Sequence, residues 1–201
     1  MSALAHEAPC DPGLDEVLWQ AWKAMDLPEG YRAEIIEGSI EVSPTGRRRH
    51  TVLVHRLRRL LESRLTGSGL EVYQDGNVIH GRKVCIPDLF VGPEDLDEIP
   101  DEEGLGVDAT RVPLVAEIVS PGKEAHRRDH VRKRRRYALA GIEVYVVIDD
   151  FEDEGTVTVF SSPDPEKGVY ATKTTVAYGT PTAIPDGPAK GLELTADLTR
   201  P

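Results

Sequence analysis

The chain has 201 residues, of which 39% are hydrophobic and 29% are charged, a balance typical of a soluble globular protein with a sizeable core. No apolar run approaches the roughly 20 residues that a membrane-spanning helix needs, and no basic region leads into an apolar one at the start, so we expect a cytoplasmic protein with no membrane partner. Cys10 and Cys85 are too few for a disulfide framework, and we expect Cys85 to be a small buried hydrophobe.

The net charge of −11 argues against a nucleic-acid partner, but the charge is unevenly distributed. Residues 47–64 hold seven arginines and one glutamate, and residues 123–136 hold eight lysines or arginines and two acids, so each segment carries +6. The rest of the chain therefore carries −23. The two basic segments could meet phosphates locally, or they could be solvated helix faces, and the sequence leaves both interpretations open.

In the first half of the chain, residues 1–13 are expected to be a flexible lead-in. Apolar periodicity predicts a helix over residues 14–25 and a long amphipathic helix over about 48–66. Between these helices, residues 32–36 and 39–42 are expected to pair as a hairpin about Glu37 and Gly38. Two further strands are expected after the long helix, over residues 70–80 and 84–91.

In the second half, residues 92–111 form an acidic loop of about 20 residues, a length typical of functional or mobile loops. Next we expect a strand over 112–120, a helix over 124–140 and a strand over 143–149. The last strand is almost continuously apolar, which is typical of a buried sheet centre. Three later strands, at 156–161, 169–176 and 192–198, would add a meander. The sequence thus predicts one α/β domain over residues 1–201, with a central mixed sheet flanked by helices and a C-terminal β-meander.

Two apolar runs each carry a single carboxylate: Asp88 lies in VCIPDLFV at 84–91, and Glu117 lies in LVAEIVSP at 114–121. A lone acid in a short apolar strand is costly to bury unless something pairs with it. Magnesium and manganese prefer hard oxygen ligands and commonly take one or two carboxylates. If the two strands are neighbours, both acids can converge on one Mg²⁺ or Mn²⁺ ion, with the backbone carbonyl of Ile118 as a third oxygen.

The helix expected at 124–140 carries Asp129, Lys133 and Tyr137 at positions i, i+4 and i+8, which share one face. A lysine on the inward edge of that face could reach over the metal, where it would orient an attacking water or neutralise developing charge on a phosphate. The alternative is a simple surface ion pair between Asp129 and Lys133, and the helix considered alone favours this alternative.

Several segments carry a resemblance in their order and spacing: AEIIEGSIEVSP at 33–44, PDLFV at 87–91, EIVSP at 117–121, D-x3-K-x3-Y at 129–137 and GIEVYVVID at 141–149. From about residue 30 to 198 the chain resembles a bacterial family classed as putative restriction endonucleases. That family was formerly a domain of unknown function and is placed in the PD-(D/E)xK nuclease superfamily. The resemblance implies a restriction-endonuclease-like core.

The resemblance also implies a role for each matching position. Asp88 and Glu117 would be the metal-binding carboxylates, and Glu34 would be an additional acid from the N-terminal hairpin. The superfamily normally places its lysine two residues after the second acid, where this chain has Val119. The family is understood to have moved this lysine onto the following helix, which would make it Lys133.

Other residues have two interpretations each. Glu37 could be a turn acid or could substitute for Glu34 at the metal, and His50 could contact substrate, orient a ligand or cap its helix. Tyr137 is expected to be half core, with its hydroxyl finding a partner near the site. Lys123 is a weaker rival for the catalytic lysine, and the arginines at 134–136 are expected to be a solvated face rather than a phosphate clamp.

The sequence shows no Ser/His/Asp signature, no phosphate-cradling glycine loop and no Cys/His metal cluster. We therefore expect a Mg²⁺-dependent endonuclease that acts on DNA. Its apolar C-terminal strands could form the interface of a homodimer. One alternative is a catalytically inactive nucleic-acid-binding or interaction module that keeps the nuclease fold. A further alternative is a metal-dependent hydrolase of some other phosphoester.

Overall fold

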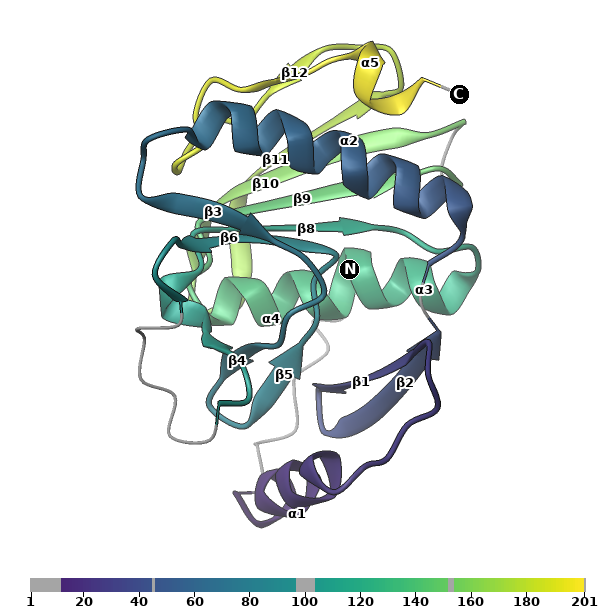
Figure 1. The fold of residues 1–201 in the computed structure, drawn as a ribbon, viewed down its shortest axis with the longest axis vertical. Helices are drawn as coiled ribbons and strands as arrows, with labels where there is room; N and C mark the ends of the chain where they lie inside the picture. Colours follow the sequence, from purple (N-terminus) through teal and green to yellow (C-terminus); the bar gives the residue numbers. More distant parts are fainter. Residues whose placement is uncertain (1–11, 45, 97–103, 152–153, 201) are drawn as a thin grey trace, which may run out of the picture.

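The computed structural model describes residues 12–44, 46–96, 104–151 and 154–200. At its centre lies a six-stranded sheet in the order β11-β10-β9-β8-β6-β3 (Figure 1). Its strands are β3 (Leu70–Tyr73), β6 (Leu89–Pro93), β8 (Leu114–Ile118), β9 (Val144–Asp149), β10 (Thr156–Asp164) and β11 (Val169–Ala177). Strands β8 and β9 are parallel and the other neighbours are antiparallel, so the sheet is mixed, as the sequence predicts.

Helix α2 (Arg48–Leu65) covers one face of this sheet (Figure 1). It buries five apolar residues at helical spacing: Leu53, Val54, Leu57, Leu61 and Leu65. Alternate residues of β8 pack on the same side, namely Leu114, Ala116 and Ile118. Val115 and Val119 belong to the core on the opposite face, and Glu117, which lies between them in the alternation, faces that side too.

A second long helical stretch covers the opposite face and connects β8 to the parallel strand β9 (Figure 1). It runs through α3 (Lys123–Arg127), the π-helical segment η3 (Arg128–Lys133) and α4 (Arg134–Leu139). The helix expected over 124–140 is thus confirmed, but its middle is π-helical. A π-helical segment rotates the following residues relative to a regular helix, and such segments are frequent at functional sites.

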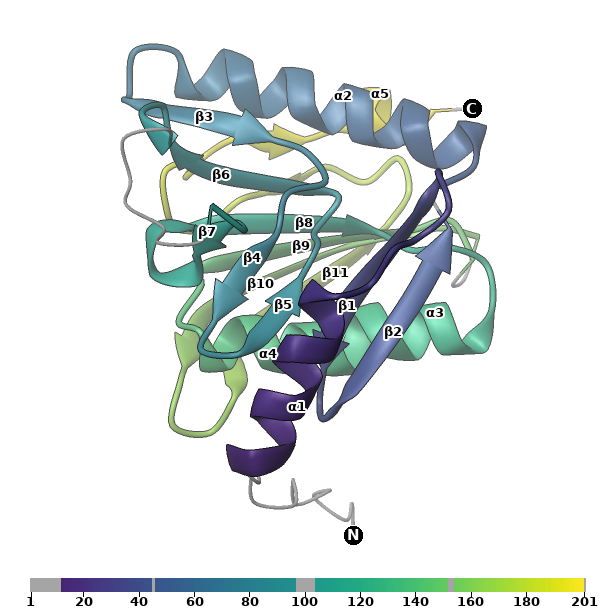
Figure 2. The same cartoon turned by 60° about the horizontal axis from the view of Figure 1, so that its bottom comes forward.

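A smaller five-stranded sheet, in the order β2-β1-β5-β4-β7, lies on the α4 side. Its strands are β1 (Tyr31–Ile36), β2 (Ser39–Pro44), β4 (Val78–His80), β5 (Lys83–Cys85) and β7 (Val107–Asp108). Figure 2 shows β1, β2, β4 and β5 crossing in front of α4, with α1 (Pro12–Lys23) outermost. Ile36 and Cys85 of this sheet share a core with Tyr137 of α4. The β1–β2 hairpin and both early helices confirm the prediction.

The strands expected at 70–80 and 84–91 are each divided between the two sheets, which corrects the prediction. The first turns at Asp75, which has a positive φ of 55°, and at Gly76, where an added Cβ would lie 2.8 Å from the Phe90 ring. The second breaks at Ile86-Pro87-Asp88, because proline cannot donate to a strand ladder. Asp88 therefore stands in a bend directly before β6, not inside a strand.

The C-terminal expectations are only partly correct. Strands β9, β10 and β11 form a meander, but its expected last strand at 192–198 is instead β13 (Glu193–Leu194), paired with β12 (Thr182–Ala183), followed by α5 (Ala196–Thr199). Leu194 and Leu198 pack into the core beneath α2. They are thus not spare apolar surface for a homodimer, and the edge strand β11 is mostly exposed, with a polar middle at residues 172–175.

Three further expectations concern the lead-in, the acidic loop and membrane-spanning helices. The lead-in expected over 1–13 lies mostly outside the described residues, although α1 already begins at Pro12. Part of the expected acidic loop is ordered as β7 and the 3-10 helix η2 (Ala109–Arg111). Within the described ranges, every helix is too short or too polar to cross a bilayer.

Candidate functional site

Asp88 and Glu117 meet because of the register between β6 and β8. Leu89 pairs with Ala116, so the next residues outward, Asp88 and Glu117, stand opposite each other. The backbone N–H of Ile118 donates to Oδ2 of Asp88 at 2.8 Å. Both acids are about 1% exposed. The two carboxylates that the sequence singles out therefore come together where β6 begins and β8 ends.

Lys133 lies at the centre of this cluster and is completely buried. Its ammonium lies 2.8 Å from Oε1 of Glu117 and 2.8 Å from Oε1 of Glu34, and it donates to the carbonyl of Ile86 at 3.2 Å. Three acceptors thus meet the three protons of the ammonium group. The surface ion pair between Asp129 and Lys133 is excluded, because both residues are fully buried.

Glu34 lies beside Lys133 because the β1–β2 hairpin pairs with the β4–β5 hairpin in the small sheet. Ile35 of β1 pairs with Val84 of β5, which places the neighbouring Glu34 beside the bend that follows β5. There the N–H of Ile86 donates to Oε1 of Glu34 at 2.6 Å. The bend that ends β5 therefore contributes an N–H to Glu34 and a carbonyl to Lys133.

Asp88 also contacts two side chains from the N-terminal part of the chain, Arg32 and His50. Arg32 donates to Oδ1 at 3.0 Å, and the Nε2 of His50, at the start of α2, lies 3.0 Å from Oδ2. The ring of His50 rests against Gly46, where an added Cβ would lie 2.2 Å from Nδ1. His50 thus orients Asp88, one of the roles considered for it.

Two further residues of the helix complete the cluster. The hydroxyl of Tyr137 donates to Oε1 of Glu117 at 2.7 Å, as expected for a residue whose hydroxyl finds a partner near the site. Asp129 pairs with Arg128, whose Nε lies 2.9 Å from Oδ1. Since Asp129, Lys133 and Tyr137 are all buried, the shared face expected of them is confirmed.

The charges of the cluster shift several pKa values. Burial raises the pKa of Glu117 above its ordinary value, opposed by the Lys133 ammonium and assisted by Asp88, Asp129 and Glu34. Burial also disfavours the charged form of Asp88, but His50, Arg32 and Lys133 outweigh it and hold that pKa below its ordinary range. The carboxylates around Lys133 likewise overcome burial and raise its pKa above the ordinary value.

The donor set suits a hard divalent cation. Four buried acids (Glu34, Asp88, Glu117 and Asp129) face three lysine or arginine side chains (Lys133, Arg32 and Arg128), with His50 as a further partner of Asp88. Carboxylate oxygens are the ligands that Mg²⁺ and Mn²⁺ prefer, so this acid-rich cluster fits such an ion.

Other candidates from the sequence lie elsewhere. Glu37 stands in the β1–β2 turn with a positive φ of 46°, and its carboxylate lies 4.0 Å from Arg135, in agreement with its interpretation as a turn acid. Lys123 is exposed at the start of α3. Arg136 is buried, so a solvated face is the wrong description of that arginine.

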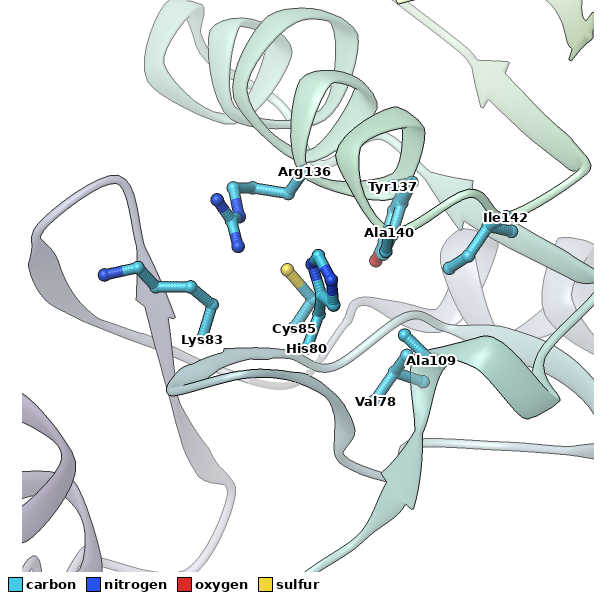
Figure 3. A pocket seen from close by; sticks show the side chains of 9 residues that line it. All are labelled: Val78, His80, Lys83, Cys85, Ala109, Arg136, Tyr137, Ala140 and Ile142. Carbon is cyan, nitrogen blue, oxygen red and sulfur yellow. The ribbon is translucent and has the colours of Figure 1, made fainter. Parts of the chain in front are cut away.

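Behind Tyr137 lies a small cavity, with about 10 Å³ of room, whose walls come from α4 and the small sheet (Figure 3). Arg136 extends from the helix over Cys85 and His80. Burial raises the pKa of the Cys85 thiol to about 12, assisted by the charge of Glu34. Cys85 is therefore a protonated, buried side chain, as expected from the sequence.

Much of the basic charge on α2 is used inside the molecule. Arg49 donates to the carbonyls of Thr199 and Arg200, and Arg56 also reaches Arg200. These arginines bind the C-terminal segment to the helix. The exposed basic side chains of α2 that remain for a phosphate backbone include Arg48 and Arg59.

The sequence analysis missed Arg32 and Arg128, the cations that pair with Asp88 and Asp129. A signal for Arg32 was present, because Arg32 and Glu34 are two residues apart on one strand and so share a face. Arg128 precedes Asp129 directly and lies with it in the π-helical segment, which has no clear sequence signature.

Comparisons with known proteins find one matching family and a similar solved structure. A family model described as Uma2, "Putative restriction endonuclease", matches residues 19–197. The fold is similar to that of a crystal structure described as "a putative nuclease belonging to DUF820" from Anabaena variabilis, with a TM-score of 0.66 and 16% identity over 90% of this chain and 95% of that chain. A search of curated proteins finds no match.

The structural likeness confirms the restriction-endonuclease-like core that the sequence predicts. Because the identity is only 16%, this likeness shows the fold alone. The family model, in contrast, matches most of the chain and shows the family. The chain therefore belongs to the family described as Uma2, "Putative restriction endonuclease".

Proposed function

We propose that this protein is a Mg²⁺- or Mn²⁺-dependent endonuclease that hydrolyses phosphodiester bonds in DNA. The observation that carries the proposal is the buried Lys133, whose ammonium lies 2.8 Å from both Glu34 and Glu117. A fully buried lysine among carboxylates from separate elements is costly to keep unless the arrangement has a use. Membership of a family described as putative restriction endonucleases suggests that this use is the hydrolysis of phosphodiester bonds.

In this proposal Glu34, Asp88 and Glu117 are the metal-binding acids, with the Ile118 carbonyl as a further oxygen. A divalent ion bound by them supplies a Lewis acid for the phosphate and a water of lowered pKa. Lys133 holds a fixed positive charge where negative charge develops on the phosphate, and it orients the attacking water. His50 and Arg32 keep the Asp88 carboxylate in place, and Tyr137 does the same for Glu117.

The test is incubation of the purified protein with supercoiled plasmid and with single-stranded DNA, in Mg²⁺, in Mn²⁺ and in EDTA. We expect nicking or linearisation that requires the metal and that falls by at least about a hundredfold in Asp88→Asn and Glu117→Gln, since each change removes an anionic oxygen ligand. Glu166→Gln, at an exposed acid in the turn between β10 and β11, is the matched control and should keep the metal-dependent rate.

Three outcomes would count against the proposal. DNA binding without cleavage by the wild type, unchanged in both acid variants, would indicate an inactive binding module. Cleavage of bis(p-nitrophenyl) phosphate with no cleavage of DNA would indicate another phosphoesterase. Cleavage that persists in both acid variants would place the active site elsewhere. A homodimer remains a prediction, which light scattering of the purified protein tests.

A further inference from the structure

A second cluster of ligand-forming side chains lies at the end of β9, beside α3 and the start of η3 (Figure 1). His126, His130 and Asp149 each place one nitrogen or oxygen there, and the three atoms all lie within 4.8 Å of one another. The sequence analysis noted no Cys/His metal cluster. The three residues meet only because the helix returns over the strand end.

The geometry is close to that of a metal site. The Nε2 atoms of His130 and His126 lie 3.0 and 3.8 Å from the same atom, Oδ2 of Asp149. Ligand atoms about 2.0–2.1 Å from a tetrahedral zinc ion are about 3.4 Å apart. The observed distances lie on either side of that value, so small side-chain rotations would bring all three atoms into coordination distance.

The three side chains are also held in orientation. The imidazole rings of His126 and His130 stack with centroids 4.2 Å apart and planes inclined by 20°, so both present Nε2 toward Asp149. The N–H of Phe151 donates to Oδ1 of Asp149 at 2.8 Å, which leaves Oδ2 as the atom directed at the rings. A hydrogen bond to the second oxygen is the kind of support that fixes a carboxylate ligand.

The cluster is accessible from one side. The side chain of Asp149 is fully buried and that of His130 is 10% exposed, whereas the side chain of His126 is 44% exposed. His126 lines a surface pocket of about 420 Å³, together with Val119, Ser120, Gly122, Lys123 and Phe151. A metal with three protein ligands commonly takes a water as the fourth, and this pocket has room for one.

The cluster differs from the proposed nuclease site in position and in chemistry. Glu117 stands opposite Val147 in the parallel pair β8–β9, and Asp149 lies two residues further along β9 on the same face. The nuclease cluster offers only oxygens, which favour Mg²⁺ or Mn²⁺, whereas two imidazoles and one carboxylate favour Zn²⁺ and its neighbours such as Co²⁺ and Ni²⁺.

We propose that His126, His130 and Asp149 form a second metal site, which binds Zn²⁺ or a similar borderline transition ion and fastens α3 and η3 to the end of β9. The ion would have a water-filled fourth position on the side of the pocket. A site of this kind stabilises the fold by the free energy of binding, since the unfolded chain does not bring the three ligands together.

The test measures metal binding, not cleavage. Chelator-treated protein is titrated with Zn²⁺ by calorimetry in the presence of excess Mg²⁺, and with Co²⁺ while its visible absorption is recorded. We expect one equivalent of Zn²⁺ with a micromolar or tighter Kd, a Co²⁺ spectrum of a low-coordinate N/O site, and a Tm that rises with Zn²⁺. His126→Gln and His130→Gln should each weaken binding by at least about tenfold.

Two controls separate this site from the alternatives. His55→Gln removes an exposed histidine of α2 and should leave Zn²⁺ binding unchanged. The double variant Asp88→Asn/Glu117→Gln should also keep the Zn²⁺ equivalent, whether or not the protein cleaves DNA. Loss of Zn²⁺ binding in that double variant, its persistence in both His126→Gln and His130→Gln, or no binding by the wild type would overturn the proposal. His126→Gln changes a half-exposed side chain, so it is the variant that keeps the test valid if His130→Gln fails to fold.

Discussion

Lys133 and Glu117 form a fully buried ion pair, with Nζ 2.8 Å from Oε1, across the interface between the helix that covers the sheet and the sheet itself. Neither residue can lose its partner without leaving a charge in a medium that solvates it poorly. The pair therefore ties the stability of the fold to the same side chains that we propose to act on phosphate.

The first prediction concerns Lys133→Met, which keeps the length of the side chain and removes its charge. The unfolding free energy should fall by about 3–5 kcal/mol, because Glu34 and Glu117 are then buried without a cation. Urea denaturation measures the change. Lys123→Met, at an exposed lysine of the same helical stretch, is the control and should change stability by less than about 0.5 kcal/mol.

If Lys133→Met were as stable as the wild type, the buried pair would not contribute as argued. Adding Glu117→Gln to Lys133→Met provides a further check. The double variant removes one of the uncompensated charges and should recover part of the lost stability, a coupling that independent sites would not show.

The second prediction concerns the effect of Mg²⁺ on stability. An ion that binds the folded acids and not the unfolded chain stabilises by about 2.7 kcal/mol at a hundredfold excess over Kd. For a chain of this size, that corresponds to a Tm increase of roughly 5–10 °C. Differential scanning calorimetry should show the increase in the wild type and its loss in Asp88→Asn. An equal increase in both proteins would mean that Mg²⁺ binds away from Asp88.

The third prediction uses the contact between Gly46 and His50. In Gly46→Ala the new Cβ would lie 2.2 Å from Nδ1 of His50, so the ring must move and lose its hydrogen bond to Asp88. DNA cleavage should fall by at least about tenfold, with little change in Tm. Gly92→Ala is the matched control, because its Cβ would meet Phe90 at an ordinary distance of 3.5 Å. If both variants were equally active, the orientation of His50 would have no role in cleavage.

The sequence predicts the centre of the site better than its surroundings. Asp88 and Glu117 are visible because each is the lone acid of an apolar run, whereas the helical spacing of Lys133 alone favours a surface ion pair and the family resemblance selects it. Glu34 depends on the resemblance entirely. Its place beside Lys133 depends on how the small sheet folds over α4, and no local pattern encodes that contact.

The errors in the fold also have physical causes. The run at 84–91 is apolar except for Asp88 because both of its halves are buried, so periodicity cannot reveal that it passes from one sheet to the other at Pro87. The π-helical turn at Arg128–Lys133 and the meeting of His126 with Asp149 are likewise tertiary features. They arise from packing of the helix on the sheet, which spacing along the chain does not record.

The fourth prediction compares two tyrosine hydroxyls. Tyr137 donates to the Glu117 carboxylate at 2.7 Å, whereas Tyr170 donates to the neutral carbonyl of Ile142 at 2.8 Å. Hydrogen bonds to charged groups contribute about 1.5–3 kcal/mol and those to neutral groups about 0.5–1.5 kcal/mol. Tyr137→Phe should therefore destabilise more than Tyr170→Phe in urea denaturation. The reverse order would show that the hydroxyl of Tyr137 contributes little to holding Glu117.

The last prediction concerns the thiol of Cys85 and pH. Burial, assisted by the charge of Glu34, raises the pKa of Cys85 from 9.0 to about 12. In a Cys10→Ser background, reaction of the folded protein with Ellman's reagent at pH 8 should be at least roughly a thousandfold slower than after unfolding, because the thiolate is the reactive form.

The same shift makes a prediction about stability. A folded pKa above the unfolded value stabilises the fold fully below pH 9 and progressively less as the pH rises from about 9 to about 12, by up to about 1.4 kcal/mol per pH unit. Cys85→Ala lacks this group, so the stability difference between the parent and this variant should shrink as the pH rises through that window. Parallel pH profiles for the two proteins between pH 9 and 11 would contradict the prediction, and rapid modification of the folded protein at pH 8 would contradict the burial on which it depends.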